Sequence, residues 1–292
     1  MSKIGASELI INPDGSVFHL HLKPEDIADD ILLVGDPGRV ELISSFFDTK
    51  EFVKSSREFV TCTGRYKGKR ITARSTGIGT DNIDIVVTEL DALANVDFAT
   101  REVKEKKRSL RLLRIGTCGG VQPDVPLGSY IFSRRSIGMD GLLNWYADRD
   151  KYSQKDVEQS FIKHMGWNEY LPVPYVANAD DALYKLFEDV VVPGITISAS
   201  GFYGPQGRVL RMGLAMPDFI EKLASFRFGN ERITNIEMEG SALAGLGGAL
   251  GHRAGTVCLL IADRNHKESN PDYKPLMNNL VKIVLDRFSK TE

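Results

Sequence analysis

Cysteine is scarce in this chain of 292 residues, and the three cysteines that occur do not form a recognisable framework. Cys62, Cys118 and Cys258 are odd in number, lie far apart and belong to no Cys/His set with metal-ligand spacing. This pattern excludes a disulfide scaffold and predicts no metal site. Cys118 adjoins a turn of small residues, but no histidine lies near it in the sequence to activate a thiol nucleophile.

Long apolar runs and blocks of positive charge are also missing. No apolar run reaches the length of about 18 residues that suggests a membrane-spanning helix. The N-terminus lacks the basic segment and apolar stretch of a secretory signal. The formal net charge is −2, and no basic stretch with interleaved aromatic residues occurs. We therefore expect a cytoplasmic protein with neither a membrane nor a nucleic acid as partner.

The sequence shows no internal boundary. It contains no repeat, no low-complexity tract and no linker rich in proline, glycine or serine. Hydrophobic residues make up 42% of the chain, which is enough for a sizeable core. Short apolar runs alternate with helical patterns, as is typical of an α/β protein. We predict one domain, residues 1–292, with a three-layer arrangement in which helices flank a mixed central sheet.

Several elements can be placed from periodicity and turn residues. The predicted strands are Ile31–Val34, Arg70–Ser75, Leu112–Gly116, Ser129–Ser133, Ile195–Ser200 and Thr256–Ala262. Helices are predicted after Gly35, after Thr80 and after Asn235, and a fourth closes the chain. The helix after Thr80 has one apolar face, made of Ile83, Val86, Leu90 and Leu93. The last helix has a similar face, made of Tyr273, Leu276, Leu280, Val284 and Phe288.

Two carboxylates, Glu237 and Glu239, stand two residues apart at the start of the apolar helix predicted after Asn235. Capping is one explanation, because the dipole at a helix N-terminus favours negative charge. Binding of paired hydroxyl groups is the other. Glycoside hydrolysis is not favoured, since side chains two residues apart diverge and do not flank one bond.

Two strand-to-turn segments bring arginine next to small residues. In the segment 32–40, an apolar strand runs into Gly35-Asp36-Pro37-Gly38-Arg39, which is either a plain β-turn or a site where backbone N–H groups and a guanidinium meet an anion. This turn is not the G-x-G-x-x-G of a dinucleotide-binding protein. In the segment 113–120, Arg114 lies inside an apolar strand, where it needs a negative partner, either an anionic ligand or a structural ion pair.

These segments occur in order with Arg57-Glu58-Phe59 and Ser75-Thr76-Gly77-Ile78-Gly79-Thr80. Together they resemble the nucleoside phosphorylase family, which includes uridine phosphorylases and hexameric purine nucleoside phosphorylases. The resemblance extends from Val17-Phe18-His19-Leu20 to Ile261-Ala262-Asp263-Arg264, nearly the whole chain. One such motif is weak, but five or more in the right order are specific.

The resemblance implies a role for each matching residue. The implied phosphate-binding residues are Gly35, Arg39, Arg57, Arg114 and Thr117. The implied ribose-binding residues are His19, Glu237, Met238 and Glu239. Arg57 and His19 would act across a dimer interface, in the neighbour's site. The implied assembly is a ring of dimers, a hexamer with the dimer as its minimal unit.

The segment 201–208 indicates which nucleobase the substrate carries. It is a glycine- and proline-marked loop in which Phe202 offers a stacking face, and Gln206 and Arg208 offer groups complementary to the carbonyl oxygens and N–H of uracil. An ordinary loop with a solvated arginine is the alternative. The loop resembles the pyrimidine-recognition loop of uridine phosphorylases, which implies that Phe202 stacks and that Gln206 and Arg208 bind uracil.

Asp263 departs from that pattern. Purine-specific relatives carry a Ser-Asp pair near this strand end to protonate the purine, whereas uridine-specific relatives have an uncharged residue beside an arginine. The resemblance therefore favours phosphorolysis of uridine, with purine nucleosides as the alternative. A nucleosidase and a non-catalytic nucleoside-binding protein are further possibilities that phosphate dependence separates.

The implied reaction transfers the ribosyl group to inorganic phosphate, which is a co-substrate, and needs no cofactor. Arg114 and the other two arginines would place the phosphate, Glu239 would hold the ribose, and Arg208 would stabilise the departing uracil. Glu58 and Ser75 match positions that some uridine phosphorylases use for a monovalent cation at the dimer interface.

Two segments are additions relative to the family pattern. The charged segment Phe98–Leu110 is expected on the surface. The segment Asn144–Tyr175 is expected to be a lid or an oligomer contact.

Overall fold

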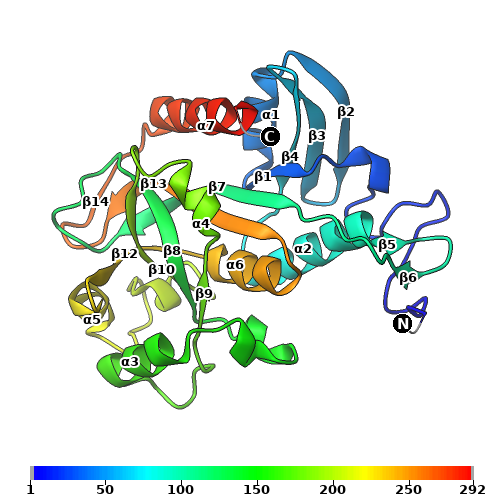
Figure 1. The fold of residues 1–292 in the computed structure, drawn as a ribbon. Helices are drawn as coiled ribbons and strands as arrows, with labels where there is room; N and C mark the ends of the chain where they lie inside the picture. The colour runs from blue at the N-terminus through cyan, green and yellow to red at the C-terminus, as the bar shows by residue number, and fades with distance from the viewer. Residues whose placement is uncertain (1–2, 291–292) are drawn as a thin grey trace.

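The computed structural model describes residues 3–290, and its central feature is a row of four parallel strands (Figure 1). They are β4 (Lys69–Ser75), β1 (Asp30–Val34), β7 (Arg111–Gly120) and β13 (Arg253–Asp263), paired in that order. Every residue of β1 is buried. Continuous apolar strands of this kind form because helices cover both faces of a parallel sheet.

Further strands extend this row to a mixed sheet. The path is β11-β12-β10-β8-β13-β7-β1-β4-β3-β2, with β9 paired to β8 and β14 paired to β13. The bounds are Thr49–Ser56 (β2), Phe59–Tyr66 (β3), Tyr130–Gly138 (β8), Tyr175–Asn178 (β9), Val192–Ser198 (β10), Arg227–Phe228 (β11), Glu231–Glu237 (β12) and Glu268–Ser269 (β14). A separate small hairpin is formed by Val96–Asp97 (β5) and Glu102–Val103 (β6).

One extra pairing closes part of the sheet on itself. β12 also pairs antiparallel with β7, where Asn235 faces Gly120 and Ile236 faces Gly119. The strands β7, β13, β8, β10 and β12 therefore form a closed ring. This closure brings the end of β12, with Glu237, beside the second half of β7.

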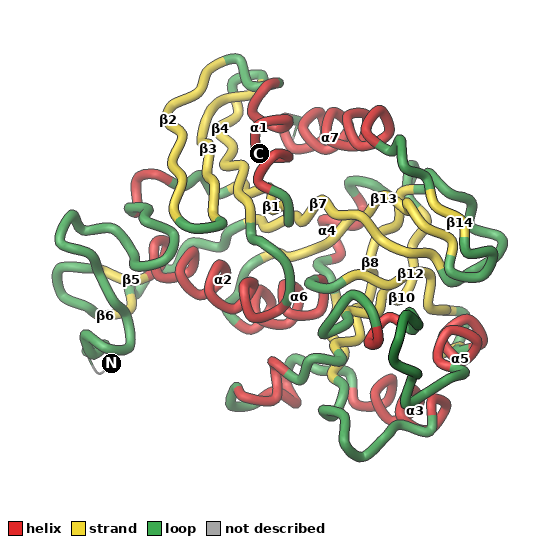
Figure 2. The backbone as a smooth tube through the Cα atoms, turned by 180° about the vertical axis from the view of Figure 1, so that it is seen from behind, coloured by secondary structure: helices red, strands yellow, loops and turns green. Residues whose placement is uncertain are grey.

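Helices cover the two faces of the central strands (Figure 2). On one face lie α1 (Pro37–Ser45), α4 (Asp181–Lys185) and α7 (Lys274–Ser289), and on the other lie α2 (Thr80–Asn95) and α6 (Gly240–Ala249). Alternate residues of β1 point to opposite faces of the sheet. Leu32 packs with α1, α4 and α7, and Ile31 packs with α2 and α6. Helices α3 (Lys155–Met165) and α5 (Phe219–Ser225) pack on β10 and β12. The sheet flanked by helices confirms the predicted α/β class.

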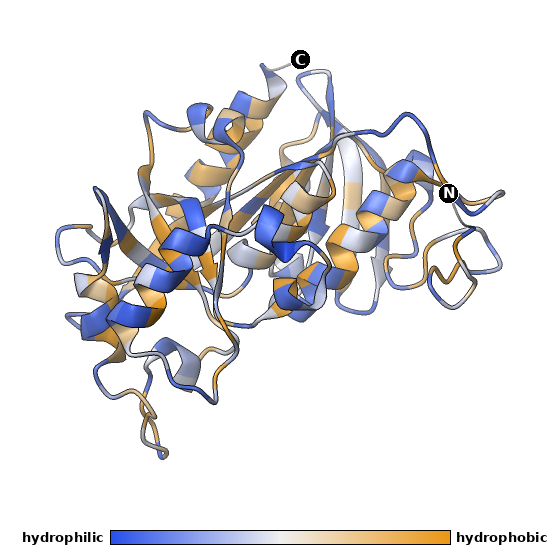
Figure 3. Ribbon diagram, turned by 60° about the horizontal axis from the view of Figure 1, so that its bottom comes forward, coloured by the Kyte–Doolittle hydropathy of each residue, from blue (hydrophilic) through white to orange (hydrophobic). Residues whose placement is uncertain are grey.

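Several helices carry both apolar and polar residues (Figure 3), whereas α6 has no charged residue and is buried over most of its length. In α2, the predicted face of Ile83, Val86, Leu90 and Leu93 is fully buried. No helix within residues 3–290 is long and apolar enough to cross a membrane.

The six predicted strands and the helices after Gly35, after Thr80 and at the C-terminal end are confirmed, although β7 and β8 continue past their predicted ends to Gly120 and Gly138. The helix predicted directly after Asn235 was wrong. Residues 231–237 form β12, and helix α6 begins only at Gly240. The stretch Glu231–Glu237 is rich in β-branched residues, and the pairing with β10 and β7 outweighs the helical spacing that starts at Ala242.

The two additional segments lie apart from the centre of the sheet. Most of Phe98–Leu110 is exposed or half-buried, as predicted, although Leu110 is buried next to the start of β7. The segment Asn144–Tyr175 folds into short 3-10 turns and α3, which packs on β9 and α5. It leaves large apolar side chains exposed, with Trp145 at 87% and Tyr170 at 88%.

Candidate active site

A cleft of about 1310 Å³ opens at the carboxyl ends of β1, β7, β12 and β13. Ligands of α/β proteins bind at this end of the strands, where the following turns gather. All the predicted site residues except His19 and Arg57 line it: Gly35, Arg39, Arg114, Thr117, Phe202, Gln206, Arg208, Glu237, Met238 and Glu239. The segment Asn144–Tyr175 contributes no lining residue, so the structure gives no support to the lid alternative.

The turn after β1 places a helix start at one corner of the cleft. Gly35, Asp36 and Pro37 line the cleft, and α1 begins at Pro37. The Asp36 carboxylate accepts a hydrogen bond of 2.9 Å from the N–H of Gly38 and so caps the helix. A side chain at Gly35 would begin 3.3 Å from the carbonyl oxygen of Gly77, which is tighter than ordinary contact. Glycine therefore allows these two turns to approach each other.

Two guanidinium groups face this corner. Arg39 is half-buried, and Nη1 donates to the carbonyl oxygen of Ile115 at 3.3 Å, but within residues 3–290 it has no ion pair with a carboxylate. Burial and the positive charge of Arg114 lower the pKa of Arg39. Arg39, which has no carboxylate partner among the described residues, lies near a second cation, Arg114. Two such cations favour binding of an anion between them, and Thr117 adds a hydroxyl to the same lining.

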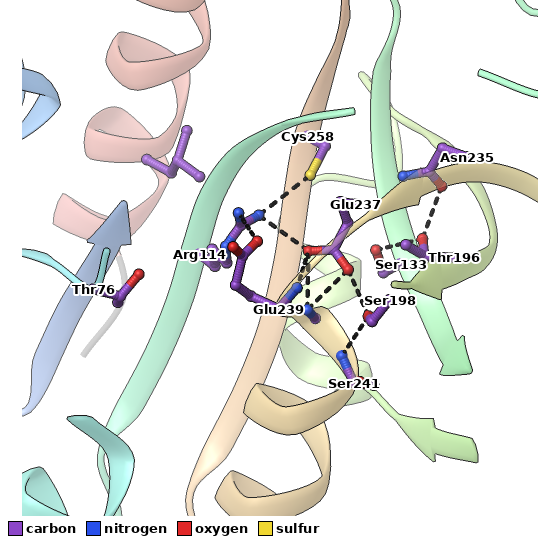
Figure 4. Close-up of polar contacts among 12 residues, drawn as sticks. Thr76, Arg114, Ser133, Thr196, Ser198, Asn235, Glu237, Glu239, Ser241 and Cys258 are labelled. Carbon is purple, nitrogen blue, oxygen red and sulfur yellow. Dashed lines mark hydrogen bonds and ion pairs between the residues drawn. The ribbon is translucent and has the colours of Figure 1, made fainter. Parts of the chain in front are cut away.

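Arg114 has the negative partners that its burial requires (Figure 4). Nη2 forms an ion pair with Glu239, and Nη1 lies 3.2 Å from Glu237 Oε2. The structural ion pair considered from the sequence is thus present, and it joins Arg114 to the pair of carboxylates predicted to hold ribose. Burial lowers the pKa of Arg114, and the charges of Glu239 and Glu237 outweigh that effect and raise it.

The two carboxylates are fixed in different ways. Glu237 ends β12 and accepts hydrogen bonds from the N–H of Glu239 at 3.0 Å, from the N–H of Gly240 at 2.9 Å and from Ser198 Oγ at 2.5 Å (Figure 4). Glu239 accepts from the N–H of Gly79 at 2.8 Å. Glu237 thus holds the first turn of α6, as the capping explanation has it, while Glu239 spans the cleft floor between Arg114 and the turn at Gly79.

The Glu239 carboxyl has a raised pKa. Burial raises it most, the Arg114 guanidinium lowers it, and the charge of Glu237 raises it again. Neither carboxylate lies free in solvent, since both residues are only 3% exposed. A buried carboxylate that keeps its charge through an arginine is a strong acceptor for hydroxyl groups in the cleft.

In the loop 201–208, Arg208 contacts both of the other predicted base-binding residues. Arg208 Nη1 donates to Gln206 Oε1 and to the carbonyl oxygen of Phe202, each at 2.6 Å, and its Cζ lies 3.8 Å from the centre of the Phe202 ring. Arginine only donates hydrogen bonds, so this contact fixes Gln206 with its oxygen toward Arg208 and its NH₂ group elsewhere. Gln206 is 4% exposed and lines the cleft. Its NH₂ group is therefore available to donate a hydrogen bond to a carbonyl oxygen of a ligand.

Arg208 keeps its positive charge near neutral pH. Burial and the nearby Arg264 lower the pKa of Arg208 to about 10. Arg264 also lines the cleft and donates to the carbonyl oxygen of Gly207 at 3.3 Å. This corner of the cleft is therefore cationic.

The Asp263 carboxylate is occupied by its own turn. It accepts from the N–H of Asn265 at 2.8 Å and from the N–H of His266 at 3.1 Å, and it pairs with His266 Nδ1 at 2.7 Å. Burial raises the pKa of Asp263, but the contacts with His266 and Asn265 outweigh burial and lower it. A carboxyl group with a lowered pKa is a poor general acid.

His19 and Arg57 lie outside the cleft, and each of them contacts Phe18. The Phe18 ring lies 4.8 Å from the His19 ring, and the Arg57 Cζ lies 5.5 Å from the Phe18 ring centre. Arg57 is exposed at the turn between β2 and β3, with a φ of 56°. We call Phe18, His19 and Arg57 the edge patch.

The cysteines do not form a reactive site. Cys62, Cys118 and Cys258 are free and buried. Burial raises the pKa of Cys118, so its side chain is a neutral thiol. Among residues 3–290, no group of three or more His, Cys, Asp or Glu side chains is arranged to hold a metal ion.

Two charged residues at these sites were missed from the sequence. Arg264 follows Asp263 at the end of β13, and two charges ending an apolar strand are a usable signal. Glu89 is buried among the apolar residues of α2 and contacts His19. A carboxylate that breaks the apolar face of a helix indicates a buried partner, but only the structure identifies that partner.

Comparison with known proteins places the chain in one family. The family description "Phosphorylase superfamily" matches residues 29–288. A uridine phosphorylase of Thermococcus kodakarensis is 31% identical over 264 residues, 90% of this chain and 83% of the relative. A uridine phosphorylase of Haemophilus influenzae is 31% identical over 262 residues, 86% of this chain and 88% of the relative.

A solved structure agrees with these matches. A nucleoside phosphorylase of Trypanosoma brucei, described as showing uridine phosphorylase activity, has a TM-score of 0.90 and 31% identity. The match covers 97% of this chain and 100% of the other. By sequence, by fold and by the motifs that meet in its cleft, this chain belongs to the phosphorylase superfamily, as a nucleoside phosphorylase.

Proposed function

We propose that this protein is a uridine phosphorylase, which cleaves uridine with inorganic phosphate to uracil and ribose 1-phosphate. The observation that carries the proposal is that three kinds of group line one cleft. Arg39 and Arg114 are neighbouring cations, Glu237 and Glu239 are carboxylates held beside Arg114, and Arg208 with Gln206 belongs to the loop 201–208 of the same lining. These are sites for an anion, for hydroxyl groups and for a polar base.

The reaction follows from these positions. A phosphate oxygen held by Arg39 and Arg114 attacks the anomeric carbon, a new C–O bond forms, and the bond from that carbon to the uracil nitrogen breaks. The electron pair of the broken bond stays on uracil, which takes a proton from solvent. Positive charge develops on the sugar, next to Glu239, and negative charge develops on the base, next to Arg208.

The loop geometry favours uracil over a purine. The NH₂ group of Gln206 is left to donate because its oxygen faces Arg208, and the uracil edge offers two carbonyl acceptors. A purine phosphorylase of this family would need an acid to protonate the purine. Asp263, the candidate for that acid, is held by the N–H groups of its turn and by His266.

The test is an assay with uridine, inosine and thymidine, each with and without phosphate, in which the sugar product is identified. Cleavage of uridine that needs phosphate and yields ribose 1-phosphate is expected. Free ribose formed without phosphate would instead indicate a nucleosidase. Faster cleavage of inosine than of uridine would indicate the purine alternative.

We propose further that the site is shared between two subunits, with the dimer as the minimal unit of a hexamer. Arg57 and His19 do not reach the cleft of their own subunit, but they form one edge patch in which both side chains are partly accessible. Arg57 would contact the phosphate in the neighbour's cleft, and His19 would contact the neighbour's ribose.

A mixing experiment tests the shared site. Subunits with Arg57→Ala and subunits with Glu239→Ala should each have low activity, and mixtures that exchange subunits should regain part of it. The reason is that a mixed dimer contains one site with an intact cleft and an intact edge patch. Without recovery in mixtures shown by mass spectrometry to exchange, Arg57 would not belong to a shared site.

The reaction as proposed needs phosphate as co-substrate and no organic cofactor, because no redox step or covalent carrier takes part. Glu58 and Ser75 are adjacent, with Ser75 Oγ donating to the carbonyl oxygen of Glu58 at 2.9 Å, and they are proposed to lie near a monovalent cation at the dimer interface. Replacing potassium by choline in the assay tests that ion. We propose that the enzyme acts in the cytoplasm, where its proposed substrates uridine and phosphate would be available.

A further inference from the structure

A buried carboxylate on α2 holds the imidazole of His19. Glu89 Oε1 lies 2.6 Å from His19 Nδ1, and the carboxylate also accepts from the N–H of His19 at 3.1 Å and from the N–H of Leu20 at 2.9 Å. The Glu89 side chain is 11% exposed, whereas the His19 side chain is 31% exposed. One carboxylate thus fixes the backbone and the ring of the same residue.

Burying the Glu89 carboxylate costs free energy unless the carboxylate gains contacts such as those with His19. The neighbouring inward residues of α2, Val86, Leu90 and Leu93, are fully buried and apolar. A carboxylate among them loses hydration, and only hydrogen bonds and opposite charge compensate for that loss. Arg74 supplies opposite charge, since it is fully buried and the charge of Glu89 acts on it.

The geometry determines which ring nitrogen carries the proton. An ionised carboxylate only accepts hydrogen bonds, so Nδ1 of His19 must carry the hydrogen in their 2.6 Å contact. In the neutral ring, Nε2 is then the unprotonated nitrogen and can accept a hydrogen bond from a hydroxyl group. No partner for Nε2 occurs within the described part of the chain.

We propose that Glu89 is a positioning residue, which fixes the tautomer and orientation of His19 so that Nε2 accepts a hydrogen bond from the ribose in the neighbouring subunit's cleft. This inference rests on the proposed shared site. It adds a residue that acts from the core of one subunit on the substrate bound by another.

The direct test is the tautomer of His19 in the unmodified protein. Long-range ¹H–¹⁵N spectra of histidine-labelled protein, with His19 assigned through His19→Asn, should show protonated Nδ1 and unprotonated Nε2 in the neutral ring. A neutral ring protonated at Nε2 would overturn the proposal. This measurement needs no activity, so it stays informative if the protein cleaves a different nucleoside.

Glu89→Gln gives the kinetic test. The single amide oxygen of glutamine is expected to accept from the backbone N–H groups, which leaves NH₂ facing Nδ1 and moves the proton to Nε2. The KM for uridine should then rise roughly 3- to 10-fold, the range of one lost hydrogen bond, with kcat and the KM for phosphate within about twofold of the wild type. Glu89→Asp, which keeps the charge, should recover part of the loss.

Asp91→Asn is the matched control. Asp91 lies on the same helix and pairs with another histidine, His252, at 3.2 Å, away from the edge patch. Its loss should lower the melting temperature without changing the KM for uridine. If Asp91→Asn changes the KM for uridine as much as Glu89→Gln does, both effects come from a disturbance of α2 as a whole. That result would overturn the proposal.

Subunit mixing separates positioning from folding. A mixed dimer of Glu89→Gln and Glu239→Ala subunits has one site with the cleft of the first and the edge patch of the second, so it should show the wild-type KM. A mixture of Glu89→Gln with His19→Ala should not, because both lesions affect the edge patch. If the first mixture keeps the raised KM, Glu89 acts within its own subunit and the proposal fails.

If wild-type protein shows no phosphate-dependent cleavage of uridine, the proposed function fails first, and the tautomer spectrum still decides the role of Glu89. If cleavage occurs and Glu89→Gln leaves the uridine KM unchanged in a folded protein, the proposed function stands and only this inference fails.

Discussion

Replacing Arg114 with alanine is expected to raise the KM for phosphate and to lower turnover by about one to two decades. In the proposed site Arg114 contacts both the phosphate and Glu239, and a charge-assisted contact of this kind contributes roughly 1.5–3 kcal/mol. Initial rates at varied phosphate and saturating uridine measure both effects. Arg114→Lys keeps the charge without the planar fork and should lie between the wild type and alanine.

The ion pair adds a cost in stability to the same substitution. Removing one partner of a buried pair leaves the other charge uncompensated, which costs about 3–5 kcal/mol. The kinetics should therefore be measured well below the melting temperature of the variant. Unchanged phosphate kinetics in folded Arg114→Ala protein would remove Arg114 from the phosphate site.

The loss of stability caused by Arg114→Ala should be larger at high pH than at low pH. Burial already raises the pKa of Glu239 above its usual value of 4.5, and Arg114 opposes that rise, so the pKa rises further in the variant. A group with a raised folded pKa stabilises the fold below its unfolded pKa, and this contribution is lost as pH rises through the folded pKa. The melting temperature of Arg114→Ala should thus fall further below the wild type at pH 8 than at pH 5. A deficit that is equal at both pH values would contradict this account of Glu239.

Alanine at Arg208 or Gln206 is expected to reduce phosphorolysis of uridine about 10- to 100-fold. A buried polar group that loses its partner costs about 1–3 kcal/mol, and each substitution leaves the uracil edge with unpaired groups. In the proposed reaction Arg208 also faces the charge that develops on the departing base, so its loss should lower kcat as well as raise the KM for uridine. Steady-state rates with uridine measure both constants.

Asp263→Asn and Arg211→Ala are the comparisons for these variants. The Asp263 carboxylate is engaged by its own turn, and Arg211 is an exposed residue beyond the cleft lining. Both should change uridine phosphorolysis far less than Arg208→Ala. Wild-type protein that prefers inosine and loses that activity on Asp263→Asn would overturn the assignment of uracil.

Much of the fold could be predicted because its signals are local. The buried parallel strands appear as apolar runs, and α2 appears through its periodic face. The edge strand β2 was missed, since most of its residues are exposed and polar. β12 was missed because it pairs with β10 and β7, strands that lie far from it in the sequence.

The sequence by itself determined the class of fold, the family and ten residues of the cleft, although it did not single out Arg264. Turn chemistry after β1 and the arginine within β7 are properties of short segments, and parallel strands bring such turns to one edge of the sheet. This is why all the predicted site residues except His19 and Arg57 meet in one place.

Only the tertiary structure decided which charges are paired. Arg114 and Glu239 are 125 positions apart, and His19 and Glu89 are 70 apart, yet each pair is in direct contact. Asp263, by contrast, is engaged by His266 three positions along. The pKa, the tautomer and the availability of a polar group depend on burial and on neighbours in space, and these are set by how strands and helices pack.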